Sequence, residues 1–321
     1  MIMRLITIDV PSFSPASMKN LVKLAVTLAI FFLIFRNIDL REVAETIGNA
    51  QLGFVLLGFT AQLLSTLVAS YRWNIIMKEL RFKQRFLFYL KSYFKGAFFN
   101  QALPTSIGGD ALRVLDIIRL GFRKRDAFAG VFIDRLVGLS GLLMLNLLAN
   151  LLRPGLLPDE VFWTINALSL GGIGAILVLM ALQRFRLNRF LPARPTTLRM
   201  LYALSRRTNR VYRGRKGAIQ IAMTLLTHLF SVLAFYCLAQ AVGIEYSLII
   251  FLVIVPPVIL LTLIPVTFAG WGVREGAMVG LFSLIGADKT AVLSMSILYG
   301  VALIITSLPG LYFYLVGKYQ I

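Results

Sequence analysis

Two arginines stand just after glycine-containing breaks in apolar sequence, where they could bind an anion. Arg113 follows Ser-Ile-Gly-Gly-Asp-Ala-Leu at 106–112, and Arg274 follows Ala-Gly-Trp-Gly-Val at 269–273. A helix N-terminus presents free N–H groups and a partial positive charge, and a guanidinium in its first turn can grip a phosphate with two hydrogen bonds. We therefore predict an anion site at these helix tips. Glycines near the two breaks would let the backbone approach a bound phosphate group closely. Alternatively, they serve only to turn the chain. They are Gly108, Gly109, Gly270 and Gly272.

Asp134 and Arg135 are adjacent charged residues inside an apolar stretch long enough to span a membrane. A charge at the centre of a membrane helix costs roughly 2.5–3.5 kcal/mol, so we expect both side chains to face the protein interior. They are therefore candidate substrate-binding residues. The alternative is a structural ion pair between helices, either Arg135 with Glu275 or Asp134 with Arg113.

Other polar residues near the breaks have both a functional and a structural interpretation. Asp110 is either a carboxylate of the substrate site or only the N-cap of the following helix. Glu275 lies beside Arg274 at the second break, which favours a role at the site for both. His228 has no second His or Cys nearby, so we expect a hydrogen-bonded helix contact and not a base or metal ligand. Amides that could line a cavity, or alternatively join helices, are Asn100, Gln101 and Asn146.

Each arginine is predicted to follow a broken helix. The aromatic stretch 86–103 is interrupted by Lys91 and Lys95, and after the break a short helix is expected over 111–120. Basic residues flank both ends of this pair, so we predict that it enters and leaves the membrane on the cytoplasmic side. A second break, at 264–275, interrupts a long apolar region and precedes another short helix over 276–285.

The two breaks resemble each other. The aligned pairs are Pro104 with Pro265, Ser106 with Thr267, Gly109 with Gly270 and Arg113 with Arg274. Each short helix then leads to a long span, 127–152 or 290–317, and the charge pattern makes those spans run in opposite directions. This predicts inverted-topology repeats, whose substrate site forms where the broken helices meet. The alternative is that both breaks are ordinary loops between complete helices.

Composition places these elements in a membrane. The chain has 321 residues, of which 58% are hydrophobic and 15% charged, leaving little sequence for a soluble domain. We predict an all-α polytopic membrane protein with about six full transmembrane helices plus two re-entrant or broken helix pairs forming an inverted repeat, or eight spans if the second pair spans fully. The other apolar runs are 24–35, 52–70, 161–182, 218–242 and 246–273.

The chemistry available to such a chain is limited. The single cysteine, Cys237, cannot close a disulfide within the chain. The sequence has no nucleotide-binding loop, no nucleophile elbow and no cluster with metal-ligand spacing. We therefore expect no cofactor and no metal, and ATP-driven pumping by this chain alone is not predicted.

The net charge of +19 is unevenly placed. Because cytoplasmic loops retain Lys and Arg, basic segments at 1–23, 71–95, 110–126 and 183–217 predict that both termini face the cytoplasm. The eleven basic residues of 183–217 could suggest nucleic acid, but topology and attraction to anionic headgroups already explain them. We expect a loose tail over 1–17 and a single transmembrane domain over 18–317, with 183–217 as a basic cytoplasmic loop.

Three motifs in order resemble the lysylphosphatidylglycerol synthase transmembrane-region family, also called the flippase-like domain family. They lie at 106–113, 132–138 (Phe-Ile-Asp-Arg-Leu-Val-Gly) and 269–276, and the resemblance covers about residues 18–316. It implies a multi-pass protein of the bacterial or archaeal cytoplasmic membrane. In multidomain synthases, the related region is assigned to moving aminoacylated phospholipid between leaflets. The residues implied by position are Gly109, Asp110, Arg113, Asp134, Arg135, Gly270, Arg274 and Glu275.

Three functions remain open at this point. The leading hypothesis is a flippase or transporter that holds the phosphate of an anionic or polyprenyl-linked lipid in a central polar cavity. The first alternative is an integral-membrane transferase acting on a lipid phosphate or polyprenyl-linked sugar, with Asp110, Asp134 or Glu275 as base. The second is a non-transporting assembly partner of envelope enzymes. Because the 321 residues include no soluble aminoacyl-transfer domain, synthesis of lysyl-lipid is not expected.

Overall fold

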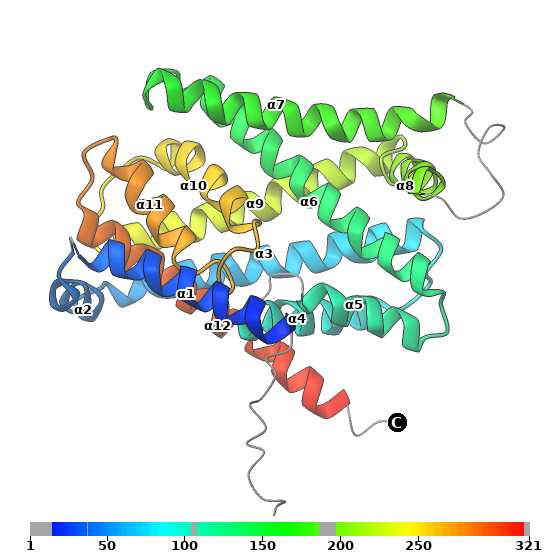
Figure 1. Ribbon diagram of the computed structural model, residues 1–321, viewed down its shortest axis with the longest axis horizontal. Helices are drawn as coiled ribbons and strands as arrows, with labels where there is room; N and C mark the ends of the chain where they lie inside the picture. Colours follow the sequence, from blue (N-terminus) through cyan, green and yellow to red (C-terminus); the bar gives the residue numbers. More distant parts are fainter. Residues whose placement is uncertain (1–14, 37, 104–107, 186–196, 318–321) are drawn as a thin grey trace, which may run out of the picture.

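The computed structural model describes residues 15–36, 38–103, 108–185 and 197–317, and their secondary structure is helical. Five long helices are apolar enough to cross a membrane, and Figure 1 shows most of them lying roughly along the long axis of the molecule. The shortest has 23 residues, enough for about 30 Å of hydrocarbon at about 1.5 Å per residue. They are α3 (Leu52–Glu79), α6 (Lys124–Leu152), α7 (Asp159–Ala181), α9 (Arg215–Ala241) and α12 (Lys289–Gly317).

Two pairs of shorter helices lie toward opposite ends of the bundle (Figure 1). The first pair is α4 (Phe86–Ala102) with α5 (Gly108–Arg119), and the second is α10 (Leu248–Thr262) with α11 (Val273–Ser283). The partners within each pair pack against each other. The longest of these four helices is α4, with 17 residues. At about 1.5 Å per residue it is about 25 Å long, which is less than the roughly 30 Å thickness of the hydrocarbon core. Both breaks predicted from the sequence are therefore present, and each separates two short helices.

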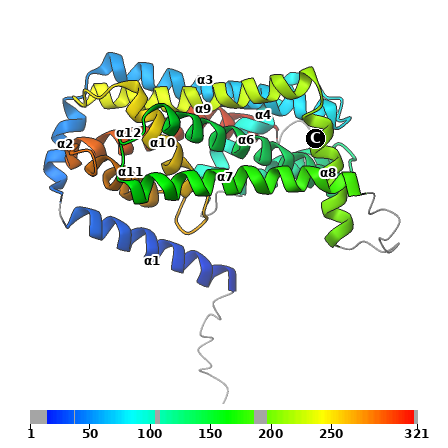
Figure 2. The same cartoon turned by 90° about the horizontal axis from the view of Figure 1, so that it is seen from above.

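The most extensive contact between two helices is that of α3 with α9, which run side by side along one face of the bundle (Figure 2). Small residues allow the close approach that is common between membrane helices. Ser65 Oγ donates a hydrogen bond to the Thr227 carbonyl at 2.9 Å. A Cβ on Gly58 would lie 2.8 Å from Leu238 Cγ, so a larger residue would push the helices apart.

Hydrophobic clusters hold the two short pairs in the bundle. Trp73 of α3 is fully buried together with Tyr89 of α4 and Ile117 of α5, so this cluster packs the first pair against α3. A larger cluster, which includes Phe251 and Phe282, packs the second pair against α3, α9 and α12. The outer surface instead exposes large apolar side chains, as a lipid-facing surface requires.

Helix α1 (Pro15–Phe35) lies at the edge of the bundle, as Figure 2 shows. It contacts α11, and its Thr27 hydroxyl accepts a hydrogen bond from the backbone N–H of Phe268 at 3.2 Å. The second break is therefore anchored to α1. Most of the predicted tail, 1–17, lies outside the described residues, and α1 begins at Pro15.

Several predicted boundaries differ from the structure. The apolar run 52–70 continues as α3 to Glu79, because Trp73, Ile76 and Met77 extend the buried face beyond the charged Arg72. The run 246–273 is divided, since α10 ends at Thr262.

Two segments that lie between predicted spans contain helices. The predicted basic loop 183–217 contains the 3-10 turn η1 (Leu182–Phe185) and α8 (Thr197–Val211), which buries one face, including Tyr202, and packs against α7. The segment 36–51, expected between two spans, contains α2 (Leu40–Gly48), whose Val43 is buried with Leu293 of α12.

Candidate functional site

The first helix pair is joined through two glycines. A Cβ on Gly109 of α5 would lie 1.8 Å from the Gly96 carbonyl oxygen of α4, so only glycine allows this approach. The Gly109 N–H donates to Asn100 Oδ1 at 2.9 Å, which satisfies a free donor at the start of α5. Gly108 is the first residue of α5. The structure therefore gives Gly109 a packing role between α4 and α5.

Five charged residues form a continuous chain of ion pairs, which we call the ion cluster. Asp134 bonds Arg72 Nη2 at 3.0 Å and Arg113 Nη2 at 2.6 Å. Arg113 Nη1 lies 3.2 Å from Asp110, whose second oxygen lies 2.6 Å from Arg135 Nε. The ion cluster connects three helices. Arg72 lies in α3, Asp110 and Arg113 lie in α5, and Asp134 and Arg135 lie in α6.

The ion cluster becomes more exposed from one end to the other. Asp134 is 1% exposed and Arg113 is 3% exposed, whereas the Arg135 side chain is 44% exposed. The Arg113 guanidinium also lies 4.1 Å from the ring centroid of Trp73 and 4.7 Å from that of Tyr93. Such cation–π contacts hold a desolvated guanidinium in place. Arg113 is therefore fixed in a desolvated position, and Arg135 is the most exposed cation of the ion cluster.

A cavity of about 190 Å³ adjoins the ion cluster and is lined by Asp110, Arg113 and Arg135. Two polar atoms on its lining residues, Arg113 Nε and Gln101 Oε1, are buried without a hydrogen-bond partner among the described residues. A buried polar atom without a partner costs free energy. The residues that line the cavity thus include one donor and one acceptor that are not yet satisfied. Further polar lining residues are Gln62, Ser65, Thr66, Tyr93, Asn100, Thr227, Thr306 and Ser307.

The second helix tip makes its own ion pair. Glu275 Oε2 accepts a hydrogen bond from the Gly272 N–H at 2.6 Å, and Glu275 Oε1 lies 2.9 Å from Arg274 Nε. Glu275 is fully buried, and Arg274 is 3% exposed between the rings of Trp271 and Tyr299. The Arg274 charge is therefore already balanced by its neighbour.

Positive backbone φ angles form the second break. Gly270 has φ +81° and Gly272 has φ +84°, and these conformations suit glycine because a Cβ would be strained there. The intervening chain ends α10 and begins α11 within ten residues, 263–272. The structure therefore gives both glycines a role in turning the chain.

The structure brings four of the predicted site residues together at the cavity and keeps the second tip apart. Asp110, Arg113 and Arg135 line the cavity, and Asp134 supports them from behind, whereas Arg274 and Glu275 are absent from the described lining. The link between the two regions is indirect. The Tyr299 hydroxyl, next to Arg274, donates to the Gln62 side chain at 3.0 Å, and Gln62 lines the cavity.

The proposed ion pairs have different outcomes. The pairing of Asp134 with Arg113 is confirmed. The pairing of Arg135 with Glu275 is wrong, because Arg135 pairs with Asp110 and Glu275 pairs with Arg274. The interpretation of Asp110 as an N-cap is also wrong, since Asp110 is the third residue of α5 and its carboxylate contacts two guanidinium groups.

The other polar residues are split between the two interpretations. His228 Nε2 is hydrogen-bonded to the Gly138 carbonyl at 2.9 Å, which confirms the helix contact. Asn146 donates to Ser169 Oγ of α7 at 2.6 Å and so joins two helices. Asn100 and Gln101 line the cavity. Within the described part of the chain, no three His, Cys, Asp or Glu side chains are grouped to bind a metal ion.

Arg72 is the residue that the sequence analysis missed. It was counted among the basic residues of 71–95, yet it is 4% exposed and also donates to Thr224 Oγ1 of α9 at 2.9 Å. The available signal was the apolar sequence Trp-Asn-Ile-Ile-Met at 73–77, which continues the helix beyond the arginine. Because the buried helix continues for another turn after Arg72, this arginine lies inside the bundle and not in the loop that follows it.

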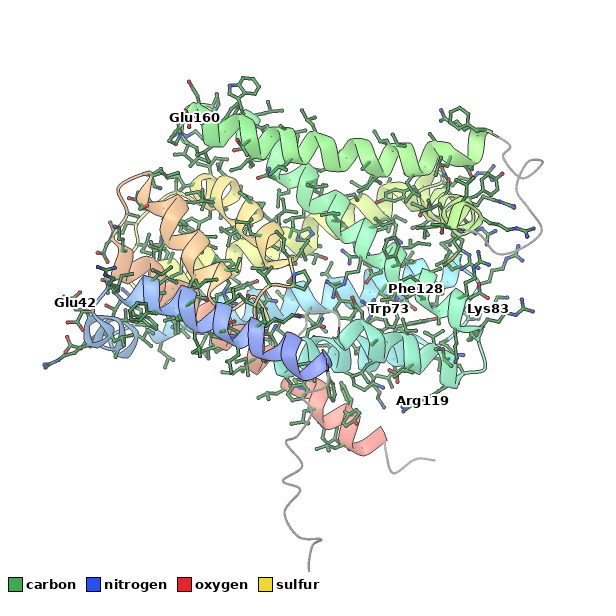
Figure 3. All side chains as sticks on the ribbon, viewed as in Figure 1. Glu42, Trp73, Lys83, Arg119, Phe128 and Glu160 are labelled. Carbon is green, nitrogen blue, oxygen red and sulfur yellow. The ribbon has the colours of Figure 1, made fainter. Side chains whose placement is uncertain are left out.

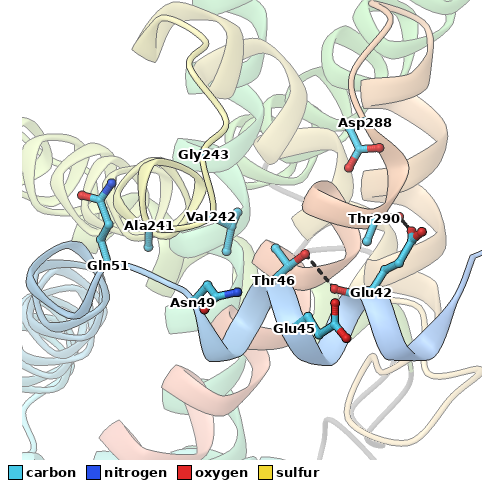
Figure 4. A pocket seen from close by; sticks show the side chains of 10 residues that line it. All are labelled: Glu42, Glu45, Thr46, Asn49, Gln51, Ala241, Val242, Gly243, Asp288 and Thr290. Carbon is cyan, nitrogen blue, oxygen red and sulfur yellow. Dashed lines mark hydrogen bonds between the residues drawn. The ribbon is translucent and has the colours of Figure 1, made fainter.

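A second hollow, of about 610 Å³, lies where α2 meets the end of α9 and the start of α12 (Figure 4). The described residues of its lining include carboxylates and no cation. Those carboxylates have other partners: Glu42 accepts from Thr290 at 3.4 Å, Glu45 pairs with Arg41 at 3.0 Å, and Asp288 accepts from the Ala291 N–H at 2.6 Å. We therefore place the candidate site at the arginine-lined cavity.

The described residues define a class, the all-helical multi-pass membrane proteins. In this chain, two breaks each separate a pair of short helices, and an ion cluster lies beside a polar cavity. The chain belongs to the family described as "Lysylphosphatidylglycerol synthase TM region", whose model matches residues 20–310. This match confirms the resemblance seen in the sequence motifs. The search of curated proteins returned no match.

Proposed function

We propose that the protein moves a phosphate-bearing lipid between the leaflets of the cytoplasmic membrane. The observation that carries this proposal is the cavity lined by Arg113 and Arg135 inside an apolar helix bundle. Its volume of about 190 Å³ is smaller than the roughly 300–1,000 Å³ of pockets that enclose whole ligands. A phosphate headgroup therefore occupies the cavity while the acyl chains stay in the lipid.

Each arginine has a distinct part in this proposal. Arg135 is half-exposed and meets the phosphate first, while Arg113 supplies the second guanidinium from a fixed, desolvated position. Charge-assisted hydrogen bonds from guanidinium to phosphate are strong in such a low-dielectric site. Asp134 and Arg72 hold Arg113 in place without touching the lipid.

The proposed topology has six full spans and two re-entrant pairs, with both termini in the cytoplasm. Each short helix falls below the roughly 20 residues that a span requires. Lys83 and Glu42 mark opposite ends of the long axis (Figure 3), and basic residues favour the cytoplasmic end. The pair α4 and α5 then enters from the cytoplasm, and α10 and α11 enter from the other side.

The order of elements supports an inverted repeat. The succession α3, α4, α5, α6 has the same pattern of long, short, short and long helices as α9, α10, α11, α12. Of the aligned sequence pairs, Gly109 with Gly270 and Arg113 with Arg274 fall on described residues, whereas Pro104 and Ser106 lie outside them. Rocking of one repeat against the other would expose the cavity to each leaflet in turn.

Transport by reconstituted protein tests the proposal. Purified protein in liposomes should move headgroup-labelled anionic phospholipid between leaflets, and Arg113→Gln should reduce the rate by at least about tenfold, because one lost charge-assisted bond is worth about 1.5–3 kcal/mol. The matched control is Arg119→Gln, which removes a 70% exposed cation from the same helix. Unchanged transport by folded Arg113→Gln protein would contradict the proposal.

Two other results would favour the alternatives. Formation of a new lipid product without transbilayer movement would favour the integral-membrane transferase. Absence of both product and movement, from protein that remains folded, would favour a non-transporting partner of envelope enzymes. Thermal unfolding of each purified variant distinguishes loss of activity from loss of structure.

A further inference from the structure

Helix α8 lies across the direction of the spans and not along it. Figure 1 shows it nearly end-on, close to the place where α7 ends and α9 begins. In Figure 2 it extends past α7, away from the rest of the bundle. Because α7 and α9 are long and apolar enough to cross the membrane, a helix that lies across their ends follows the membrane surface.

Side chains of α8 hold it in this orientation. The Met180 carbonyl, in the last turn of α7, accepts hydrogen bonds from Ser205 Oγ at 3.2 Å and from Asn209 Nδ2 at 2.7 Å. These bonds satisfy a carbonyl of the kind that the end of a helix leaves free. Arg207 forms an ion pair with Asp126, in the first turn of α6. Helix α8 is therefore fixed to two spans.

One face of α8 is buried in its second half and exposed in its first half. Ser205 and Thr208 are fully buried. Leu198 precedes Ser205 by seven residues, and Leu201 precedes Thr208 by seven. Seven residues make about two helical turns, so each leucine lies on the same face as its buried counterpart. The two leucines are nevertheless 47% and 40% exposed, so this face continues beyond the protein.

The opposite face of α8 is basic. Arg206 and Arg210 are one turn apart and exposed, on the side away from Ser205 and Thr208. The helix is polar on balance. A polar helix with one apolar and one basic face is typical of helices that lie in the membrane interface, with the apolar face about 5–10 Å deep at the boundary of headgroups and acyl chains.

We propose that the first half of α8 is an interfacial anchor that binds the lipid surface around the bundle. Leu198 and Leu201 lie among the upper parts of the acyl chains, and Arg206 and Arg210 lie at the level of the headgroups. A second copy of the chain fits this face less well, because it would bring two basic helices together. The contact requires only that the chain spans the bilayer, so it does not depend on lipid transport.

Fluorescence quenching tests the depth of each face. Leu198→Cys and Arg206→Cys, each in a Cys237→Ser background, are labelled with bimane and reconstituted in nanodiscs of phosphatidylcholine and phosphatidylserine. A nitroxide near the top of the acyl chain should quench the probe at 198 at least about threefold more than the probe at 206, as about 5–10 Å of burial implies. Aqueous acrylamide should show the reverse preference. Both native side chains are exposed, so the label does not disturb the packed core.

Two outcomes of this experiment would overturn the proposal. Equal quenching of the two probes by acrylamide would place the first half of α8 in water. Protection of the probe at 198 from both quenchers would mean that protein covers it. Disulfide crosslinking through Leu198→Cys would then identify a second copy of the chain as the partner.

A charge placed on the apolar face provides the second test. Leu201→Glu, added to the chain labelled at 198, should reduce quenching by the lipid nitroxide at least about twofold, because a carboxylate is costly in hydrocarbon. The matched control is Met200→Glu, since Met200 is 49% exposed but lies on another side of the helix. Equal effects of the two variants would show that α8 has no lipid-facing side, and would overturn the proposal.

Discussion

Asp134 is the residue on which the ion cluster depends, because it is 1% exposed and receives hydrogen bonds from two arginines. A buried carboxylate between two guanidinium groups contributes little net stability, yet its removal leaves buried charge without a partner. We predict that Asp134→Asn lowers the free energy of unfolding by about 3–5 kcal/mol. The measurement is equilibrium unfolding of the purified protein in detergent.

Asp110→Asn is the matched comparison for Asp134→Asn. Of its two partners, Arg135 is 44% exposed and can be solvated after the change, and Arg113 keeps its ion pair with Asp134. The loss should therefore be smaller, about 1–2 kcal/mol. Equal losses for the two variants would show that burial does not set the cost of breaking this cluster.

The helix pairs depend on glycine for two different reasons. Gly109 lies against the Gly96 carbonyl oxygen, whereas Gly270 and Gly272 adopt positive φ angles. The sequence could predict that both breaks exist, because glycine interrupts an apolar pattern. It could not predict which glycines pack and which turn, because that difference depends on the neighbouring helix.

Gly109→Ala should separate α4 from α5. The added Cβ would lie 1.8 Å from a backbone oxygen, which cannot move as a flexible side chain would. We therefore predict a markedly lower thermal unfolding midpoint for Gly109→Ala. The control is Gly280→Ala in α11, where nothing lies within 4 Å of the added atom. Alanine in a helix interior is favoured over glycine by up to about 1 kcal/mol, so the control should be neutral or stabilising. A neutral Gly109→Ala would contradict the close contact.

At the scale of the whole molecule, the sequence predicted the spans better than it predicted the site. Apolar runs identify helices because every span must bury its backbone hydrogen bonds. Charges inside those runs indicate interior positions, and one of the two ion pairs considered on that basis, Asp134 with Arg113, is present. The pattern could not identify the partner of Arg135, nor the burial of Arg72, because both depend on how distant helices pack.

The remaining question at this scale is whether α10 and α11 return to the side from which they enter. Labelling with a membrane-impermeant maleimide answers it in a Cys237→Ser background, which removes the single native cysteine. Glu42→Cys and Lys83→Cys report the two ends of the molecule, which Figure 3 places apart. We predict that the first is labelled only from outside and the second only from the cytoplasm.

Val266→Cys, in the break between α10 and α11, is the decisive position. The native side chain is 44% exposed, so lack of space would not prevent labelling. In a re-entrant pair this position faces the hydrocarbon, where a charged reagent does not reach and a cysteine remains mostly protonated. We therefore predict no labelling from either side, with full labelling after solubilisation and denaturation. Labelling from the cytoplasm would instead mean that α10 and α11 both cross the membrane, which would remove the inverted repeat and the rocking mechanism built on it.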